Sequence, residues 1–383
     1  MNPGKKIIIH FVHSAPTPHN NYLLDELAKH PGIELHRHYI CEPRQVSGRP
    51  WSSMNSGNVD LENIRTGINK YCDFRLITYA LFDKSSVFFV IGWDYLILVL
   101  LIIIVGIRCR PLIMWDDGPT PEAVSRLNSW SPKQTVKRFL IECINRSPGA
   151  YFYTGNIARE GLIAMGFRQS KFIQMPFFVK PGNDSDGLGR QLNLDTHCVH
   201  VLAGGRLIWS KGYDVFVNAL GMLKQQGVET WKATLIGSGE EGERLKRIAA
   251  EHGLEGQLRF IEWAEPDVFS SYIRDCDIFV APARFDHFPT TIIGAMQAGK
   301  AVLATDKVGS AVEFIVPGKN GMIVPSENPQ AIASSLFFLI QNQAERTRMG
   351  SEAQKTISVW PVERGVEQIV CAARESLSVY AAS

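Results

Sequence analysis

Two cationic side chains, Arg206 and Lys211, lie close together in the second half of the sequence, on either side of a glycine-rich turn. The segment from His200 to Phe216 has the pattern of a buried strand, a turn around Gly205 and the start of a helix. An arginine can bind two phosphate oxygens through its planar fork, and a lysine adds a compact charge. Ligands of open α/β sheets bind at the carboxyl ends of the strands, so we predict that Arg206 and Lys211 stabilise a departing diphosphate. Such charges make a divalent ion unnecessary, so the predicted site contains no metal.

A second turn that could bind phosphate is the segment Asp286–Phe288, which includes His287. Pro289 is predicted to be the first helical residue after it, and the free N–H groups of a helix start point back toward such a turn. A helix N-terminus is a ready anion site, although the same pattern also describes an ordinary helix start. Because the two features occur together, we predict that Phe288 and Pro289 contact the same diphosphate as the two cations.

The segment Gly237–Gly242 matches the G-x-G-x-x-G pattern of dinucleotide-binding turns, between a predicted strand and a predicted helix. A pyrophosphate there would meet Glu240, Glu241 and Glu243, whose charges already neutralise the positive end of the helix. We therefore reject an NAD or FAD site. The segment is interpreted as a tight turn, with Gly237 as a residue that contacts the predicted ligand.

Strand and helix patterns alternate along the chain and restart once, which predicts an α/β fold of two doubly wound domains. At 383 residues the chain is too long for one ordinary core. The predicted domains are residues 1–182 and 191–359, joined by a linker at 183–190. Residues 360–383 contain a last helix that we expect to pack back on the first domain. Residues 41–70 are predicted to form a long loop.

An apolar run from Tyr95 to Ile107 lies between Asp94 and Arg108. A membrane-spanning helix needs about 20 apolar residues, so the run favours a buried helix over a span. We predict a strand at Val87–Ile91, a turn at Gly92 and then this helix. A helix that lies in a membrane interface is the alternative, and a protein integrated in the membrane is a further one.

The composition describes a well-packed soluble protein, with 45% hydrophobic and 20% charged residues and a net charge of +2. The seven cysteines are scattered and form no C-x-x-C pair, which argues against disulfides and zinc and favours a reducing compartment. The N-terminal apolar run is too short for a signal peptide. The first half is basic, which would suit contact with anionic lipid or reflect compositional drift. We expect a cytoplasmic protein that can contact the inner face of a membrane.

Polar side chains also follow the predicted strands of the first domain. Asp116 and Asp117 end one strand, and Asp117 could orient or deprotonate the hydroxyl group of an acceptor. The alternative is that both carboxylates cap the turn before Pro119. His10, His13 and His19 are the other polar residues near the end of the first strand, and we interpret all three as single satisfied residues and not as ligands.

Four motifs occur in the order and spacing of the retaining glycosyltransferases of family 4: GGRLIWSKG, GSGEE, DIFVAPARFDHFPTTIIGAM and GSAVEFIVPGKNGMIV. The likeness is close over residues 200–325 and loose in the first half. The resemblance implies a GT-B fold, in which two Rossmann-like domains face a central cleft. It also implies a nucleotide-diphosphate sugar as donor, UDP or GDP, with no metal and no cofactor. The implied reaction is transfer of a hexose with retention to a glycan or a lipid-linked acceptor, as in polysaccharide or lipopolysaccharide assembly.

The resemblance also assigns roles to residues. Arg206 and Lys211 would hold the donor diphosphate, and Asp286 would take the first acidic position of the Glu-x7-Glu signature and contact the donor sugar. The segment after a further strand would frame the base through its backbone; its residues are Glu262, Trp263 and Ala264. These roles make Arg206, Lys211, Asp286 and Asp117 the predicted catalytic residues.

The sequence departs from the family at Gly294, where the signature has its second Glu. In the family that Glu binds the ribose hydroxyls, and hydrogen bonds of this kind contribute about 1–3 kcal/mol each. The substitution leaves open a non-catalytic binding subunit of the same fold. A nucleotide-sugar epimerase or a phosphorylase of this fold is the other alternative.

Overall fold

The computed structural model describes residues 6–40, 74–119, 124–125, 131–182 and 198–382. The chain folds as two compact units, one formed by Met1–Phe178 with Trp360–Ser383 and the other by Val179–Val359. We call them unit 1 and unit 2. The predicted linker at 183–190 and the whole of the predicted loop at 41–70 lie outside the described residues.

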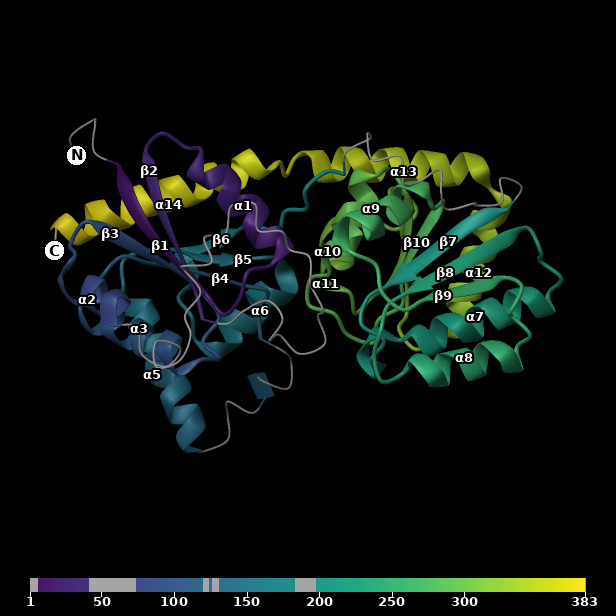
Figure 1. Ribbon diagram of the computed structural model, residues 1–383, viewed down its shortest axis with the longest axis horizontal. Helices are drawn as coiled ribbons and strands as arrows, with labels where there is room; N and C mark the ends of the chain where they lie inside the picture. The colour runs from purple at the N-terminus through teal and green to yellow at the C-terminus, as the bar shows by residue number, and fades with distance from the viewer. Residues whose placement is uncertain (1–5, 41–73, 120–123, 126–130, 183–197, 383) are drawn as a thin grey trace. The chain divides into compact units, whose positions relative to one another are not determined.

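Unit 1 contains a six-stranded parallel sheet with the strand order β2-β1-β3-β4-β5-β6 (Figure 1). Its strands are rich in buried apolar residues, which is typical of a parallel sheet covered by helices on both faces. The strands are β1 Ile7–His13, β2 Ile33–Tyr39, β3 Ser86–Ile91, β4 Leu112–Asp116, β5 Tyr151–Tyr153 and β6 Phe172–Gln174.

Two groups of helices cover this sheet. Helices α1 (Pro18–Ala28) and α14 (Val362–Ala382) contribute to one hydrophobic cluster. A second cluster contains residues of four helices, which are α2 Phe74–Phe82, α3 Leu96–Ile107, α5 Pro132–Arg146 and α6 Asn156–Met165. Helix α14 follows unit 2 in the sequence but supplies buried side chains to the core of unit 1.

Helix α3 has no polar side chain and follows β3 through a turn at Gly92, whose φ is 75°. The predicted strand, turn and helix are therefore all present. Burial is one-sided, since Leu101 and Ile102 are 0% exposed whereas Leu96 and Ile107 are 60% and 66% exposed. The expectation of a fully buried helix is wrong for these two residues. None of the described helices is both long and apolar enough to cross a bilayer.

Unit 2 contains a second six-stranded parallel sheet, in the order β12-β11-β10-β7-β8-β9. The strands are β7 Val199–Gly204, β8 Trp231–Ile236, β9 Leu258–Ile261, β10 Ile278–Ala281, β11 Ala301–Thr305 and β12 Met322–Val324. The helices are α7 Tyr213–Gln225, α8 Gly242–Glu251, α9 Pro266–Asp275, α10 Thr290–Gln297, α11 Gly309–Phe314, α12 Pro329–Gln341 and α13 Gln343–Ser358.

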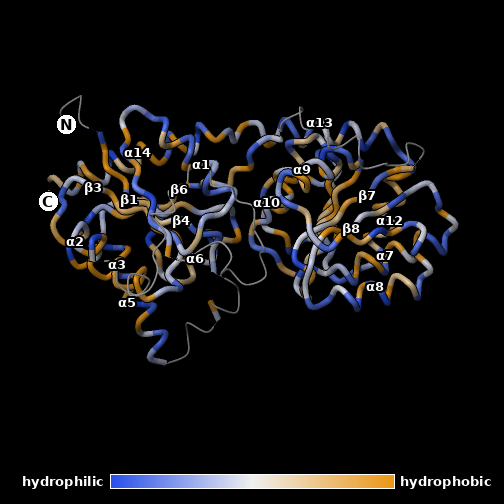
Figure 2. The backbone as a smooth tube through the Cα atoms, viewed as in Figure 1, coloured by the Kyte–Doolittle hydropathy of each residue, from blue (hydrophilic) through white to orange (hydrophobic). Residues whose placement is uncertain are grey.

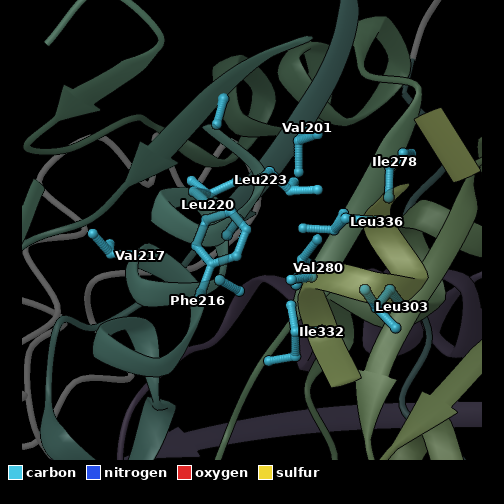
Figure 3. Close-up of a cluster of buried hydrophobic side chains, with 14 of the residues drawn as sticks. Val201, Phe216, Val217, Leu220, Leu223, Ile278, Val280, Leu303, Ile332 and Leu336 are labelled. Atoms are coloured by element: carbon cyan, nitrogen blue, oxygen red, sulfur yellow. The ribbon is translucent and has the colours of Figure 1, made fainter. Parts of the chain in front are cut away.

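The core of unit 2 lies between the sheet and helices α7, α8 and α12. Phe216 and Leu220 of α7 pack with Leu336 of α12 against Val201 and Val280 of the central strands (Figure 3). Strands β7 and β10 are neighbours in this sheet, so the loops after them begin side by side at its carboxyl edge. This adjacency positions the candidate site.

Candidate active site

The loops that follow β7 and β8 are joined by backbone hydrogen bonds. The Gly205 N–H donates to the Ile236 carbonyl (2.9 Å), and the Leu207 N–H donates to the Ser238 carbonyl (2.8 Å). A Cβ on Gly237 would lie 1.8 Å from the Gly205 carbonyl oxygen, so only glycine fits there. The G-x-G-x-x-G segment is thus a tight turn that supports the loop carrying Arg206.

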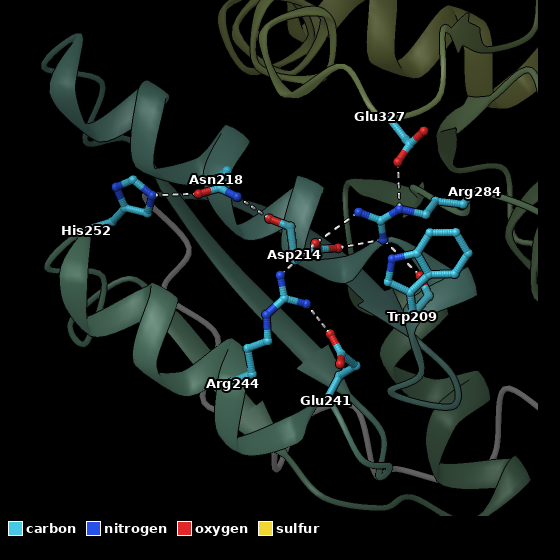
Figure 4. Close-up of polar contacts among 8 residues, drawn as sticks. All are labelled: Trp209, Asp214, Asn218, Glu241, Arg244, His252, Arg284 and Glu327. Atoms are coloured by element: carbon cyan, nitrogen blue, oxygen red, sulfur yellow. Dashed lines mark hydrogen bonds and ion pairs between the residues drawn. The ribbon is translucent and has the colours of Figure 1, made fainter.

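The segments that carry Lys211 and Asp286 are held together by Arg284. Its guanidinium donates to both carboxylate oxygens of Asp214, at 2.8 and 2.9 Å, and to the Trp209 carbonyl at 2.8 Å (Figure 4). The guanidinium carbon also lies 4.8 Å from the centroid of the Trp209 ring. These contacts tie the loop after β10 to the loop and helix after β7.

The pair formed by Asp214 and Arg284 is mostly buried, with each side chain 11% exposed. Burial alone would raise the pKa of Asp214, but the hydrogen bonds and charge of Arg284 outweigh it and lower that pKa. Glu327 accepts a further bond from Arg284 at 3.0 Å and is itself 63% exposed. The pair is therefore a charged anchor under the candidate site, and Glu327 is its solvent-facing partner.

Lys211 and Asp286 form an ion pair between Nζ and Oδ2, and each side chain is 18% exposed. The backbone of Asp286 is fixed by its own N–H, which donates to the Lys307 carbonyl (3.0 Å), and by the Gly309 N–H, which donates to the Asp286 carbonyl (2.9 Å). The structure thus brings together two predicted site residues from distant parts of the sequence. A lysine ammonium group and a carboxylate that can accept hydrogen bonds from hydroxyl groups therefore lie side by side at the carboxyl edge of the sheet.

Arg206 is exposed, and among the residues that the structure describes no carboxylate forms an ion pair with it. The buried phenol of Tyr213 lies near both Arg206 and Asp286. Burial and then the charge of Asp286 raise the pKa of Tyr213, while the charge of Arg206 opposes the rise. The charges of Arg206 and Asp286 are therefore both close enough to act on the same phenol.

Helix α10 begins at Thr290, directly after Pro289, so Pro289 is the N-cap and not the predicted first helical residue. No side chain caps this helix start and no acidic residue lies in its first turn. The positive partial charge of its free N–H groups is therefore not neutralised by the helix itself. Phe288 is 4% exposed and packs on Phe314, with ring centroids 5.8 Å apart. The side chain of Phe288 therefore belongs to the core, and only its backbone could meet a ligand.

Four further predicted residues lie in this turn and in the loop after β9. His287 has its ring 4.7 Å from the ring of Phe285, and a Cβ on Gly309 would lie 1.8 Å from its carbonyl oxygen. Glu262 is exposed and Ala264 is partly buried in the loop after β9. The indole N–H of Trp263 is buried and has no hydrogen-bond partner within the described part of the chain.

Gly294 lies in α10, at the edge of a pocket of about 390 Å³. A Cβ on it would lie 3.6 Å from Ile273 and 3.9 Å from Val179, which are ordinary contact distances. A Cβ therefore fits at this position, and the pocket that Gly294 lines offers space beyond it. The pocket carries polar and basic groups but no carboxylate; they are Lys180, Ser270, Arg274, Gln297 and Gln354.

A second pocket, of about 440 Å³, lies in unit 1 at the carboxyl ends of β1, β3 and β4. Its polar lining includes His13, Asp94, Asp116, Asp117 and Lys137. Burial, together with the charge of Asp117 and a hydrogen bond to it, holds the pKa of Asp116 well above its ordinary value. Asp116 also accepts a 3.1 Å bond from the Gly118 N–H, so it caps the turn, while Asp117 lines the pocket as well.

His10 and His19 lie apart from this pocket, unlike His13. His10 is 2% exposed, and its Nδ1 lies 3.1 Å from Nε2 of His38. His19 packs on Phe177, with ring centroids 4.5 Å apart. These contacts make both side chains part of the packing of unit 1. The interpretation of His10 as fully satisfied is wrong, because its Nε2 is buried and has no hydrogen-bond partner among the described residues.

Arg284, Asp214 and Trp209 were not predicted as site residues. The pattern near them carried a weak signal, because Arg284 lies shortly after strand β10 and Asp214 lies in the first turn of helix α7. Which of these two segments would meet depends on the adjacency of β7 and β10, and the sequence does not reveal that order.

Residues 190–356 match the family model described as Glycosyl transferases group 1. The D-inositol 3-phosphate glycosyltransferase of Corynebacterium glutamicum is 28% identical over 249 residues, which are 62% of this chain and 57% of the relative. The lipopolysaccharide core biosynthesis glycosyltransferase LpsE of Rhizobium meliloti is 26% identical over 157 residues, 41% of this chain and 44% of LpsE. The chain thus spans about half the length of the curated relatives it matches. The predicted resemblance to glycosyltransferases is confirmed at the level of this group.

Solved structures cover nearly the whole chain at low identity. A glycosyltransferase from Rickettsia africae has a TM-score of 0.74 at 14% identity and covers 97% of this chain and 99% of its own. HepE from Anabaena, solved in complex with UDP-glucose, has a TM-score of 0.70 at 18% identity and covers 95% of this chain and 98% of its own. The likeness establishes the GT-B fold, with two parallel sheets flanked by helices.

Proposed function

We propose that this chain is a glycosyltransferase that moves a hexose from a nucleotide-diphosphate donor to an acceptor, with retention and without a metal ion. One observation carries the proposal. The ion pair of Lys211 and Asp286 lies with the exposed Arg206 at the carboxyl ends of β7 and β10. Cations that are held in place before a reaction can stabilise charge that develops on a leaving group.

In the proposed reaction the donor diphosphate binds to Arg206, Lys211 and the uncapped start of α10. Asp286 accepts a hydrogen bond from a hydroxyl of the donor sugar. The bond between the anomeric carbon and the diphosphate breaks, and the diphosphate takes the electron pair. The acceptor oxygen bonds to the same face of the sugar, and its proton passes to an oxygen of the leaving diphosphate. Asp117 is the residue that we propose to orient the acceptor hydroxyl for this step.

Donor and acceptor are proposed from the relatives. HepE was solved with UDP-glucose, so a UDP-sugar is the first donor to test, and a GDP-sugar is the second. LpsE acts in lipopolysaccharide core biosynthesis, and AmsK of Erwinia amylovora acts in amylovoran biosynthesis. We infer a glycan or lipid-linked acceptor and a location in the cytoplasm or at the inner face of its membrane.

The test measures the binding of UDP and GDP by calorimetry and the release of free sugar from UDP- and GDP-sugars in the presence of EDTA. We expect one nucleotide to bind and its sugar to be released. Lys211→Ala should reduce turnover by about 10²–10³-fold, the range for removal of one preorganised charge donor. Lys246→Ala is the matched control, since Lys246 is also ion-paired but lies in α8 with 43% of its side chain exposed. A Lys211→Ala variant as fast as the parent would contradict the proposal.

A non-catalytic binding subunit is the second candidate, and Gly294 favours it because no carboxylate stands there for the ribose. Such a subunit would bind neither UDP nor GDP in the calorimeter, even at millimolar concentration, and would release no sugar from any donor. Absence of nucleotide binding, unchanged by the addition of divalent ions, would therefore select this candidate.

A further inference from the structure

One face of unit 1 exposes large apolar side chains on α2, α3 and α5. Phe82, Ile107 and Leu96 are 72%, 66% and 60% exposed, and Val136 and Phe139 are each 48% exposed. We define these five residues as the apolar surface. Figure 2 shows α2 and α3 as largely hydrophobic segments. Single exposed apolar residues are ordinary, but five on three packed helices indicate an interaction site.

The three helices form one continuous layer. Gly106 of α3 approaches α5 so closely that a Cβ on it would lie 2.3 Å from Cβ of Cys143. Nη2 of Arg108 donates to the Leu81 carbonyl at 3.2 Å, which brings the C-terminal ends of α2 and α3 together. The three helices that carry the exposed side chains therefore pack on one another and need no bound partner to stay in place.

Basic residues accompany the apolar surface. Exposed cations lie next to it along the chain; they are Lys84 beside Phe82, Arg108 beside Ile107, and Lys133 and Arg138 beside Val136 and Phe139. Helix α5 contains no acidic residue before Glu142. Exposed apolar side chains with flanking lysines and arginines are the pattern of a helix that binds the interface of an anionic membrane.

We propose that the apolar surface docks on an anionic lipid bilayer. Charge complementarity selects this occupant, because the cations near the surface outnumber the neighbouring carboxylates, which are Asp83, Asp94 and Glu142. The cations would meet lipid phosphates while the apolar side chains enter the acyl boundary. The pocket that contains Asp117 lies at the edge of the surface, because Tyr95 and Leu98 at the start of α3 and Lys137 of α5 line it. An acceptor held in the bilayer by an apolar chain would reach the pocket without leaving the membrane. This last step depends on the proposed function, whereas the docking does not.

The experiment is flotation of the full chain with vesicles, in the absence of donor and acceptor. One set of vesicles contains phosphatidylcholine only, and the other contains about 30% phosphatidylglycerol, which supplies the negative surface potential. We expect binding to the anionic vesicles that weakens at high salt, since salt screens exposed charges. Failure of nucleotide binding would leave this result untouched, so the two proposals fail separately.

Two variants locate the surface. Phe139→Ser should weaken binding to anionic vesicles by about five- to tenfold, the loss expected for one half-buried aromatic ring. Lys133→Gln should weaken it about fivefold, as for one cation near the surface. Phe337→Ser is the matched control, because Phe337 is 43% exposed on α12 of unit 2 and should change nothing. Circular dichroism of each variant separates loss of binding from loss of fold.

Three results would overturn the proposal. The first is no binding to either kind of vesicle. The second is an equal loss of binding in the Phe337→Ser control, which would show non-specific adsorption. The third is a concentration-dependent dimer in sedimentation that Phe139→Ser converts to a monomer, since the surface would then join two copies of this chain.

Discussion

Removal of the Arg284 side chain tests how the two site loops are held. Arg284→Ala deletes both bonds to Asp214, at 2.8 and 2.9 Å, and leaves a carboxylate that is 11% exposed without its main counter-ion. Breaking a buried pair on one side costs about 3–5 kcal/mol when the remaining charge is uncompensated. Nη2 of Arg244, a side chain that is 46% exposed, still lies 3.4 Å from the Asp214 carboxylate and compensates part of its charge, so we expect a cost near the lower end of that range. In a domain of this size 1 kcal/mol shifts the melting temperature by about 2–4 °C, so we expect a fall of roughly 10 °C for unit 2.

Calorimetric unfolding measures this fall, and double-mutant analysis assigns it. Asp214→Ala combined with Arg284→Ala should be less destabilised than the sum of the two single variants, because the double variant buries no unpaired charge. Glu327→Ala is the control. Glu327 is 63% exposed and binds the same guanidinium, so its removal should cost about 1 kcal/mol or less. A loss below 1 kcal/mol for Arg284→Ala, or strict additivity in the double variant, would refute the reasoning.

Two further predictions concern single positions. Burial and the charge of His36 lower the pKa of His10 from 6.5 to about 4, so the unfolded chain binds more protons between these values. Stability should therefore be complete above pH 6.5 and fall by roughly 3 kcal/mol as the pH drops to 4, and His10→Phe should flatten that part of a urea-unfolding profile. Gly294→Glu should raise the affinity for UDP about tenfold or more by restoring bonds to the ribose, because the nearest atoms at 3.6 and 3.9 Å leave room for the side chain. Gly294→Gln is its uncharged control in calorimetry, and weaker binding by Gly294→Glu would contradict the assignment of the ribose position.

The pairing of Lys211 with Asp286 illustrates how far the sequence reaches. Both residues follow predicted strands, and parallel strands end at one edge of a sheet, so both belong to the same edge. Their direct contact required more, because β10 must lie beside β7 and Arg284 must bind Asp214. Strand order and buried ion pairs arise from long-range packing, which no local pattern encodes.

Pro289 and helix α3 show two other limits of prediction from the sequence. Proline fixes φ near −65° both at an N-cap and at the first helical position, and only ψ, here 124°, makes Pro289 the cap. Helix α3 was predicted from its apolar run, but an all-apolar helix has no period that distinguishes the buried face. The exposure of Leu96 and Ile107 could therefore be learned only from the packed structure.

Helix α14 makes unit 1 discontinuous, since its residues return to a core that the first part of the chain begins. Ile369 and Ala373 are 0% exposed in that core. During synthesis the first unit to appear thus lacks part of its interior until the last residues emerge, whereas unit 2 is one uninterrupted segment. Domains usually fold as they are made, from the N-terminus onward. Here unit 2 can complete its fold before unit 1. A nascent chain that ends before α14 would expose apolar core residues of unit 1, which chaperones bind.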